Sequence, residues 1–223
     1  MESMLLVLSF INRRTYADTI KECSVNPNTV MSCRTVADYF SFCREVCIAA
    51  VEEHHGGKKI GGVGHIVQVD ESKLGKRKYE RGRIVEGVWI FGMVDDDTNE
   101  IRLEICADNK RDEATLEMMI RNVEVGSVVV SDGWKGYVNL PKYGFTHFTV
   151  NHSENFVDPV SGLHTQKMEG YWRVLKSKLQ KGGVRKCDLG FHLLEFMYFQ
   201  NMKGLGRDPF HMFLGDIVKL YGV

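Results

Sequence analysis

The sequence predicts an α/β fold in which a mixed five-stranded sheet has flanking helices and is preceded by a small helical region. Three observations support this prediction. Residues 12–53 show the apolar spacing of amphipathic helices. Residues 65–150 alternate short apolar runs with turn signals and contain one helical stretch, as a sheet with a crossover helix would. Residues 165–202 return to helical spacing, so helices should cover the sheet.

The N-terminal region predicts two helices joined by a tight turn. Residues 15–23 form a short helix, and residues 24–28 contain a proline and two asparagines, which break helices. Asn28 can cap a longer helix that starts at residue 29 and continues to residue 53. This order matches the helix-turn-helix plan, and a plain helical hairpin fits the pattern equally well.

A flexible segment separates this region from the rest of the chain. Residues 54–64 are rich in glycine and also contain lysine, the composition of a solvated linker. We therefore expect residues 1–58 to form a helical helix-turn-helix region and residues 59–223 to form the α/β domain. The apolar stretch at 4–11 predicts a buried helix or strand before the first turn.

The strands of the sheet follow from the apolar runs. They are predicted at residues 65–70, 84–94, 101–107, 127–131 and 145–150. The first three form an antiparallel meander. The amphipathic helix at 112–123 then crosses over, so the fourth strand should lie parallel to the first and beside it. A mixed five-stranded sheet of this order is the ribonuclease-H-like plan. Two further helices are expected at 165–179 and 186–202.

Composition narrows the class of protein. The formal net charge is zero, which argues mildly against a nucleic-acid enzyme because such proteins are usually basic. The charge is uneven, however, and local basic patches bind phosphates although the total is neutral. Two basic blocks are present: Lys73, Lys76, Arg77, Lys78, Arg81 and Arg83, and Lys176, Lys178, Lys181, Arg185 and Lys186.

The remaining composition predicts an intracellular protein. The apolar runs are too short to span a bilayer. Residues 4–11 resemble the apolar part of a signal peptide but have no basic segment before them. The six cysteines contain no CxxC pair and no zinc-site spacing, so reduced thiols are expected.

Three acidic residues occupy positions where they can meet. Asp70 ends the first strand and Asp132 follows the fourth, which places them at neighbouring carboxyl ends of parallel strands, where ligands bind in α/β sheets. Glu169 lies on the helix that follows. Taken singly, each is more simply a turn acid or a surface acid. Three clustered carboxylates repel one another unless a cation lies between them. Oxygen ligands suit Mg²⁺ or Mn²⁺, and two such ions suit phosphoryl transfer.

Lys176 supports this interpretation. It lies two helical turns after Glu169 and therefore on the same face of the helix, with Trp172 and Arg173 on the same general side. A metal-binding acid and a cation that binds phosphate would then face one groove. A solvated lysine on an exposed helix face is the simpler alternative.

At this level of detail the chain resembles a known family. Residues 69–73, 130–137, 150–159 and 164–176 carry four motifs, in order, of the catalytic domain of ISXO-like insertion-sequence transposases and of their eukaryotic relatives, the Merlin-type transposases. The resemblance covers residues 60–202. The preceding region resembles the helix-turn-helix that such proteins carry before this domain, which implies that residues 1–58 bind DNA.

The resemblance implies a DDE-type transposase with a ribonuclease-H-like catalytic domain. Asp70, Asp132 and Glu169 match the catalytic acids and would hold two Mg²⁺ or Mn²⁺ ions. The reaction would be DNA strand cleavage and strand transfer at terminal inverted repeats, with a homodimer or larger assembly on double-stranded DNA. The host would decide between nucleus and bacterial cytoplasm. The residues expected to contact DNA are Lys176, Lys135, Lys73, Lys76, Arg77, Lys78, Asn151, His152, Trp172 and Arg173. For His164 we favour a scaffolding role.

One departure from the family keeps alternatives open. Relatives often carry a zinc ribbon before the helix-turn-helix, and this sequence has no matching cysteine set, which predicts a truncated or domesticated copy. A domesticated, catalytically inactive DNA-binding protein is therefore the main alternative. A ribonuclease H or Holliday-junction nuclease would share the metal site but needs no helix-turn-helix. A structural protein whose acids are only turn residues is the third alternative.

Overall fold

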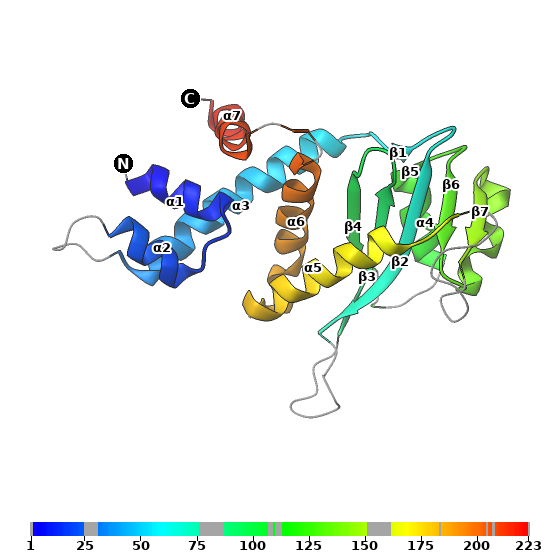
Figure 1. The fold of residues 1–223 in the computed structure, drawn as a ribbon, viewed down its shortest axis with the longest axis horizontal. Coiled ribbons are helices and arrows are strands. Elements are labelled where there is room, and N and C mark those ends of the chain that lie inside the picture. Colours follow the sequence, from blue (N-terminus) through cyan, green and yellow to red (C-terminus); the bar gives the residue numbers. More distant parts are fainter. Residues whose placement is uncertain are drawn as a thin grey trace. The chain divides into compact units, whose positions relative to one another are not determined.

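The computed structural model describes residues 2–24, 31–75, 87–106, 109, 113–150, 162–182, 184–203, 205–206 and 208–222. Figure 1 shows the helices and strands in chain order. The chain divides into two compact units. Unit 1 comprises Met1–His54 with Leu205–Val223, and unit 2 comprises His55–Gly204. None of the helices in the described ranges combines the length and the apolar character needed to cross a membrane.

Unit 1 contains the helices α1 (Glu2–Ile11), α2 (Tyr16–Cys23), α3 (Cys33–His55) and α7 (Pro209–Tyr221). Its core is aromatic. The ring of Phe10 packs edge-on against Phe40 with centroids 5.3 Å apart, and Phe213 lies 5.8 Å from Phe10. Because these rings come from α1, α3 and α7, apolar burial holds the three helices together.

The boundaries of the predicted helix pair need one correction. Helix α2 begins where expected, and Thr15 caps it by accepting a hydrogen bond from the Asp18 amide at 3.2 Å. Helix α3 begins at Cys33 rather than at residue 29, because the Ser32 hydroxyl accepts from the Thr35 amide at 3.0 Å and so supplies the cap. The proposed cap, Asn28, lies outside the described residues.

The C-terminal helix α7 does not belong to the domain that the predicted division at residue 58 gives it. That division placed residues 59–223 in one domain, whereas α7 packs on α1 within unit 1. Asp208 caps α7 through the amides of Phe210 and His211, and Pro209 occupies its first position. An Asp-Pro start followed by apolar residues is a helix signal that could have been found in the sequence. The helix-turn-helix and DNA-binding role of the N-terminal region stays a prediction.

Unit 2 is built on a mixed sheet with the strand order β4-β3-β2-β6-β7. The strands are β2 (Ile66–Leu74), β3 (Val88–Asp95), β4 (Ile101–Ile105), β6 (Val128–Ser131) and β7 (Thr146–Thr149). Strands β2, β3 and β4 are antiparallel neighbours, while β6 is parallel to β2 and β7 to β6. This order and these directions confirm the predicted ribonuclease-H-like fold (Figure 1).

Two segments around the sheet differ from prediction. Strand β2 continues to Leu74 because it pairs with β3 over its whole second half, so Asp70 lies inside the strand and not at its end. The predicted linker is also partly ordered. Helix α3 runs to His55, and β1 (Ile60–Gly61) pairs in parallel with β5 (Val123–Glu124), because Ile60 is buried in the core of unit 2.

The sheet of unit 2 is covered on both faces. On one face Val67 and Val69 pack in a core with Met119 of α4 (Glu113–Asn122) and Tyr137 of the 3-10 helix η3 (Lys135–Tyr143). On the other face α5 (Gln166–Gly182) lies against β2, and α6 (Leu189–Lys203) packs along β4 after the short 3-10 helix η4 (Lys186–Asp188). Since side chains alternate along a strand, even-numbered residues of β2 such as Asp70 point toward α5.

Candidate active site

The parallel pairing of β2 and β6 brings two of the predicted acids together. Gln68 lies beside Val130 in this pair, and the same register two residues further on sets Asp70 level with Asp132. Asp70, Asp132 and Glu71 each offer a carboxylate oxygen, and these atoms lie within 4.8 Å of one another. The expected convergence of Asp70 and Asp132 is therefore present.

A backbone amide and an indole help to orient the Asp70 carboxylate. Its Oδ1 accepts a hydrogen bond from the Glu71 amide at 2.8 Å, and its Oδ2 accepts one from Trp172 Nε1 at 3.0 Å. Trp172 comes from α5 and is only 4% exposed. This bond attaches the helix that carries Glu169 directly to the first aspartate.

The close approach of α5 depends on a glycine. Gly92 of β3 pairs with Asp70 across the strands. A Cβ atom at this position would lie 2.4 Å from Met168 Cε and 2.6 Å from Trp172 Cζ2. The Trp172 ring thus occupies the volume that any other residue at position 92 would need.

A turn at the end of β6 holds Asp132. Its Oδ1 accepts from the Trp134 amide at 3.1 Å, which is the side-chain-to-backbone bond that aspartate forms when it starts a turn. The preceding Ser131 donates to the Asp132 carbonyl at 2.8 Å and contacts His147 Nε2 of β7 at 2.9 Å. Burial lowers the pKa of His147, so this imidazole is uncharged near neutral pH.

A buried tyrosine connects the segments that carry the two aspartates. The hydroxyl of Tyr137, in η3, donates to Glu71 Oε1 at 2.6 Å. Burial, together with the charges of Glu71, Asp132 and Asp70, raises the pKa of Tyr137 well above its usual value. The hydroxyl therefore keeps its proton and remains a donor at any working pH.

Glu169 is positioned by α5 but does not join the other acids. Within the described ranges, it is not part of the group whose oxygens lie within 4.8 Å of one another. Its amide donates to the Thr165 carbonyl at 3.1 Å in the first turn of the helix. Glu169 lies one turn before Trp172, which itself contacts Asp70, so its side chain is on the side of α5 that faces the site. Its role as third acid stays a prediction.

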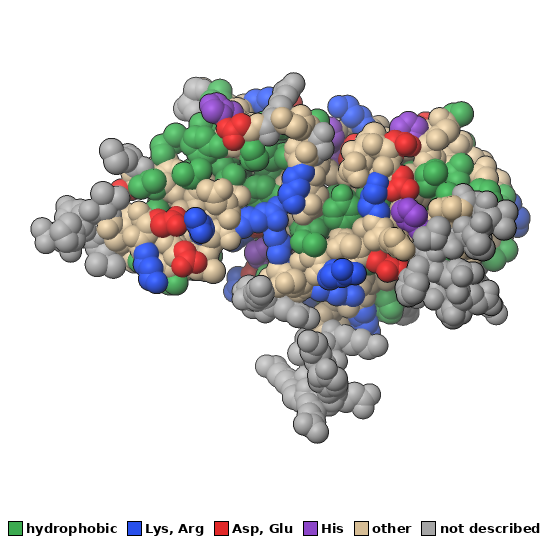
Figure 2. Space-filling model, in the orientation of Figure 1, with side chains coloured by type: hydrophobic (Ala, Val, Ile, Leu, Met, Phe, Trp, Pro, Cys, Tyr) green, Lys and Arg blue, Asp and Glu red, His purple; other side chains and the backbone are tan. Residues whose placement is uncertain are grey.

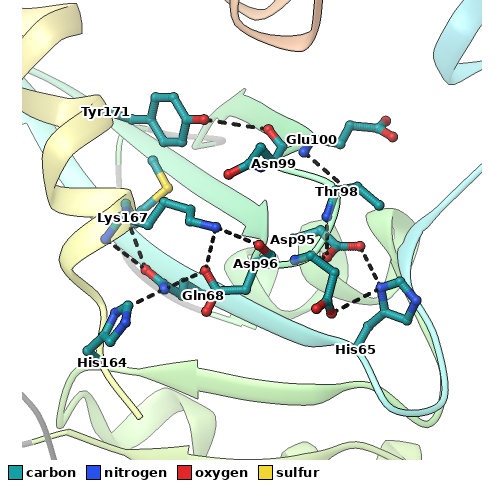
Figure 3. A network of polar contacts seen from close by, with 12 residues as sticks. His65, Gln68, Asp95, Asp96, Thr98, Asn99, Glu100, His164, Lys167 and Tyr171 are labelled. Carbon is teal, nitrogen blue, oxygen red and sulfur yellow. Dashed lines mark hydrogen bonds and ion pairs between the residues drawn. The ribbon is translucent and has the colours of Figure 1, made fainter. Parts of the chain in front are cut away.

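A second group of potential metal ligands is explained by the β3–β4 hairpin. His65, Asp95 and Asp97 also offer atoms within 4.8 Å of one another, and Figure 3 shows His65 beside Asp95. Asp95 is buried and accepts from the amides of Asp97 and Thr98 at 2.9 and 3.3 Å and from His65 at 3.0 Å. Burial alone would raise the pKa of Asp95, but these hydrogen bonds outweigh it and the pKa is lowered. Its oxygens hold a turn together.

Residues 60–199 match the family model of the ISXO2-like transposase domain. The chain belongs to this family. The match includes β2, α5 and most of α6, and it confirms the family predicted from the four motifs. A search of curated proteins found no significant match to this transposase.

Solved structures of integrases and a transposase are similar to this transposase at low identity. The HTLV-2 integrase catalytic core domain in complex with magnesium is 12% identical, with a TM-score of 0.37, over 63% of this chain and 86% of that one. The simian T-cell lymphotropic virus intasome in complex with a PP2A regulatory subunit has 12% identity and a TM-score of 0.40, over 88% and 65%. The pre-cleavage Mos1 transpososome has 9% and 0.28, over 90% and 77%. The strand order and register, not these distant likenesses, identify the fold.

The predicted DNA-contacting residues of the transposase have different environments. Arg173 is exposed on α5 and Lys176 is half-buried one turn further on. Figure 2 shows basic side chains along α5 on the face drawn there. Lys73 Nζ lies 5.7 Å from the ring centroid of Trp89, a cation–π distance. The residues whose side chains or whole placement lie outside the described set are Lys76, Arg77, Lys78, Lys135, Asn151 and His152.

Trp172 requires a correction. It was predicted to contact DNA, but its ring is buried between α5 and β3 and its Nε1–H donates to Asp70. The reason is that Trp172 lies on the sheet-facing side of the helix, where the apolar ring is removed from water. The structure thus places its indole against the Asp70 carboxylate and not on an exposed surface.

Sequence reasoning missed three residues that shape this site: Gly92, Glu71 and Tyr137. The motif Asp132-Gly133-Trp134-Lys135-Gly136-Tyr137 was noted only as a resemblance. A tyrosine that could bond to a buried acid is a signal visible in the sequence. No local pattern identifies Glu71 as that acid, because it lies 66 residues away from Tyr137.

The Tyr137–Glu71 bond gives a first testable prediction. Tyr137→Phe should lower the free energy of unfolding of the transposase by about 1.5–3 kcal/mol, because it removes a hydrogen bond to a buried carboxylate. Urea unfolding measures this loss. Tyr143→Phe is the matched control, since Tyr143 is 47% exposed and its substitution should change stability by less than about 0.5 kcal/mol. Equal effects of the two substitutions would contradict the structural role of this bond.

Proposed function

We propose that this chain is a DDE-type transposase that performs metal-dependent DNA strand cleavage and strand transfer at terminal inverted repeats. One observation carries the proposal: Asp70 on β2 lies level with Asp132, which directly follows the parallel neighbour β6, and α5, with Glu169 in its first turn, is hydrogen-bonded to Asp70 through Trp172. Membership of the ISXO2-like transposase family supports DNA as the substrate.

The residues fit Mg²⁺ or Mn²⁺. Asp70 and Asp132 provide only oxygen atoms as ligands. Their oxygens lie within 4.8 Å of each other, which is close to the largest separation of two ligands that each lie about 2.1 Å from the same ion. Bound ions of this kind would activate the attacking water in cleavage, or the attacking 3′-hydroxyl in strand transfer, and stabilise the leaving 3′ oxygen. Glu169 would complete the ligand set from α5.

The other groups of the site orient these acids and bind DNA. The Trp172 indole and the Glu71 amide hold the Asp70 carboxylate, while the Trp134 amide holds Asp132, so neither side chain must reorganise during the reaction. Arg173 and Lys176 lie further along α5, where they would bind phosphates of the substrate.

The partners follow from the reaction. A transposase joins two DNA ends, so we infer that at least two copies assemble on double-stranded DNA. Unit 1 would bind the terminal repeat through its helices. The protein would act inside the cell, in the nucleus or the bacterial cytoplasm according to host.

A cleavage assay tests the function. The full chain is incubated with duplexes that contain the inverted repeats flanking its gene, with Mg²⁺ or with EDTA. We expect new 3′-hydroxyl ends and strand-transfer products only with the metal. RNA–DNA hybrids and four-way junctions should remain intact. Cleavage of either substrate in place of repeat DNA would identify a nuclease, and binding of repeats without cleavage in Mg²⁺ or Mn²⁺ would identify an inactive DNA-binding descendant.

A further inference from the structure

We propose that Gln68 is a positioning residue that sets the place of Glu169 relative to Asp70 by capping α5 from the central strand of the sheet. The inference rests on the proposed function, in which Glu169 is the third acid. Gln68 lies two residues before Asp70 on the same face of β2 and is fully buried. A buried amide needs hydrogen-bond partners, and those that Gln68 has among the described residues lie in segments that meet the first turn of α5.

The side-chain carbonyl oxygen of Gln68 caps helix α5. Its Oε1 accepts from the amide of Lys167 at 3.1 Å and from that of Met168 at 3.2 Å. These amides belong to the second and third residues of α5, which have no carbonyl partner within the helix. A cap residue adjacent in sequence usually satisfies them. Here the acceptor comes from a strand about 100 residues earlier, so the cap also sets the position of the helix on the sheet.

The amide nitrogen of Gln68 is held as well. Its Nε2 donates to Asp96 Oδ1 at 2.8 Å and lies 3.3 Å from His164 Nδ1, consistent with the scaffolding role favoured for His164 (Figure 3). Lys167 Nζ pairs with the same Asp96 oxygen at 2.9 Å and donates to the Asp96 carbonyl at 2.6 Å. We call Gln68, Asp96 and Lys167 the α5 clasp. It ties the start of α5 to β2 and to the turn after β3.

Two residues of the α5 clasp lie close to Asp70 and Glu169 in the sequence, each two positions before one of these acids. Glu169 follows Met168, whose amide binds Gln68, and Asp70 follows Gln68 by two residues. A shift of the first turn of α5 therefore moves Glu169 while Asp70 stays on the strand. Partners that orient metal ligands typically change metal affinity or activity about 10- to 100-fold when they are removed. The clasp should have an effect of this size on a site that uses Glu169.

Metal binding tests the clasp separately from catalysis. Mn²⁺ affinity of the full chain is measured by calorimetry for the wild type, Gln68→Met and Glu169→Gln. Methionine has the length of glutamine but neither caps α5 nor binds Asp96. We expect both variants to bind Mn²⁺ about 10- to 100-fold more weakly, and Gln68→Met to lower strand cleavage by a similar factor with unchanged affinity for DNA. Thermal unfolding shows whether each variant is folded.

Exchanging the amide of Gln68 and the carboxylate of Asp96 in a double variant keeps the net charge and separates a positioning role of Gln68 from simple destabilisation. Gln68→Glu keeps the acceptor for the two helix amides but places a second carboxylate against Asp96, so it should weaken Mn²⁺ binding. Adding Asp96→Asn restores a donor–acceptor pair with the roles reversed and leaves one negative charge beside Lys167. The double variant should recover metal affinity to within a few-fold of the wild type. No effect of Gln68→Met on Mn²⁺ affinity, or no recovery in the double variant, would overturn the inference. Failure of the wild-type protein to cleave repeat DNA would instead count against the proposed function.

Discussion

Asp132→Asn is expected to lower Mg²⁺-dependent strand cleavage about 10³-fold or more while leaving the fold and DNA binding intact. The substitution removes the charge and one metal-binding oxygen. It keeps Oδ1, so the asparagine can still accept from the Trp134 amide and maintain the turn after β6. A metal ion contributes several kcal/mol of transition-state stabilisation, and about 4 kcal/mol corresponds to a factor of 10³ in rate.

The measurement is single-turnover cleavage of repeat DNA, with DNA affinity and thermal unfolding measured alongside. Asp97→Asn is the matched control because Asp97 is an exposed acid in the turn after β3, and its loss makes the same change of charge. This control should cleave at the wild-type rate. Cleavage by Asp132→Asn within tenfold of the wild type would show that Asp132 is a turn residue and would remove the basis of the proposed mechanism.

Gly92→Ala is expected to have the second largest effect because it acts on stability and on catalysis together. The new methyl group would overlap Met168 Cε and the ring of Trp172, at 2.4 and 2.6 Å. Met168 can change rotamer, but the indole ring is rigid and lies against the sheet. The helix must therefore move outward, and the hydrogen bond from Trp172 Nε1 to Asp70 Oδ2 would be lost.

We expect Gly92→Ala to lower the free energy of unfolding by about 1–3 kcal/mol, as overpacking of a filled core does. Cleavage should fall about 10²-fold, because a displacement of about 1 Å in a positioned group has this effect on rate. Urea unfolding and single-turnover cleavage measure the two losses.

Gly190→Ala is the control for Gly92→Ala. Gly190 lies on α6, and apart from its chain neighbours and the backbone of its own helix no atom lies within 4 Å of the added methyl group; because alanine also favours helix, this variant should be as stable as the wild type or more so. Wild-type activity of Gly92→Ala would mean that α5 is not held through Trp172.

Several features of this transposase could be read from local sequence patterns. Short apolar runs, alternating in some strands and continuous in others, predicted the strands, and the crossover rule predicted that β6 lies parallel to β2, which brought Asp70 and Asp132 together. These inferences succeed because side-chain alternation and connection handedness depend on the residues of each element and of the one that follows it. Four motifs in order predicted the family, which the match over residues 60–199 confirms.

The positions of particular side chains could not be read in this way. The extension of β2 beyond Asp70 depends on its pairing with β3, and the assignment of α7 to unit 1 depends on where Phe213 is buried. Trp172 was expected on a DNA-facing surface because helical spacing shows which residues share a face but not which face meets the sheet.

The sequence by itself determined the order of the strands, the class of fold, the family and two of the acids that meet. Only the tertiary structure decided how the acids are oriented: by Trp172 packed over Gly92, by Tyr137 bonded to Glu71 and by Gln68 at the start of α5. The physical reason is the range of the interactions. Periodicity and turn chemistry act over a few residues, whereas these contacts join residues up to about 100 positions apart and exist only once the sheet and its helices have packed.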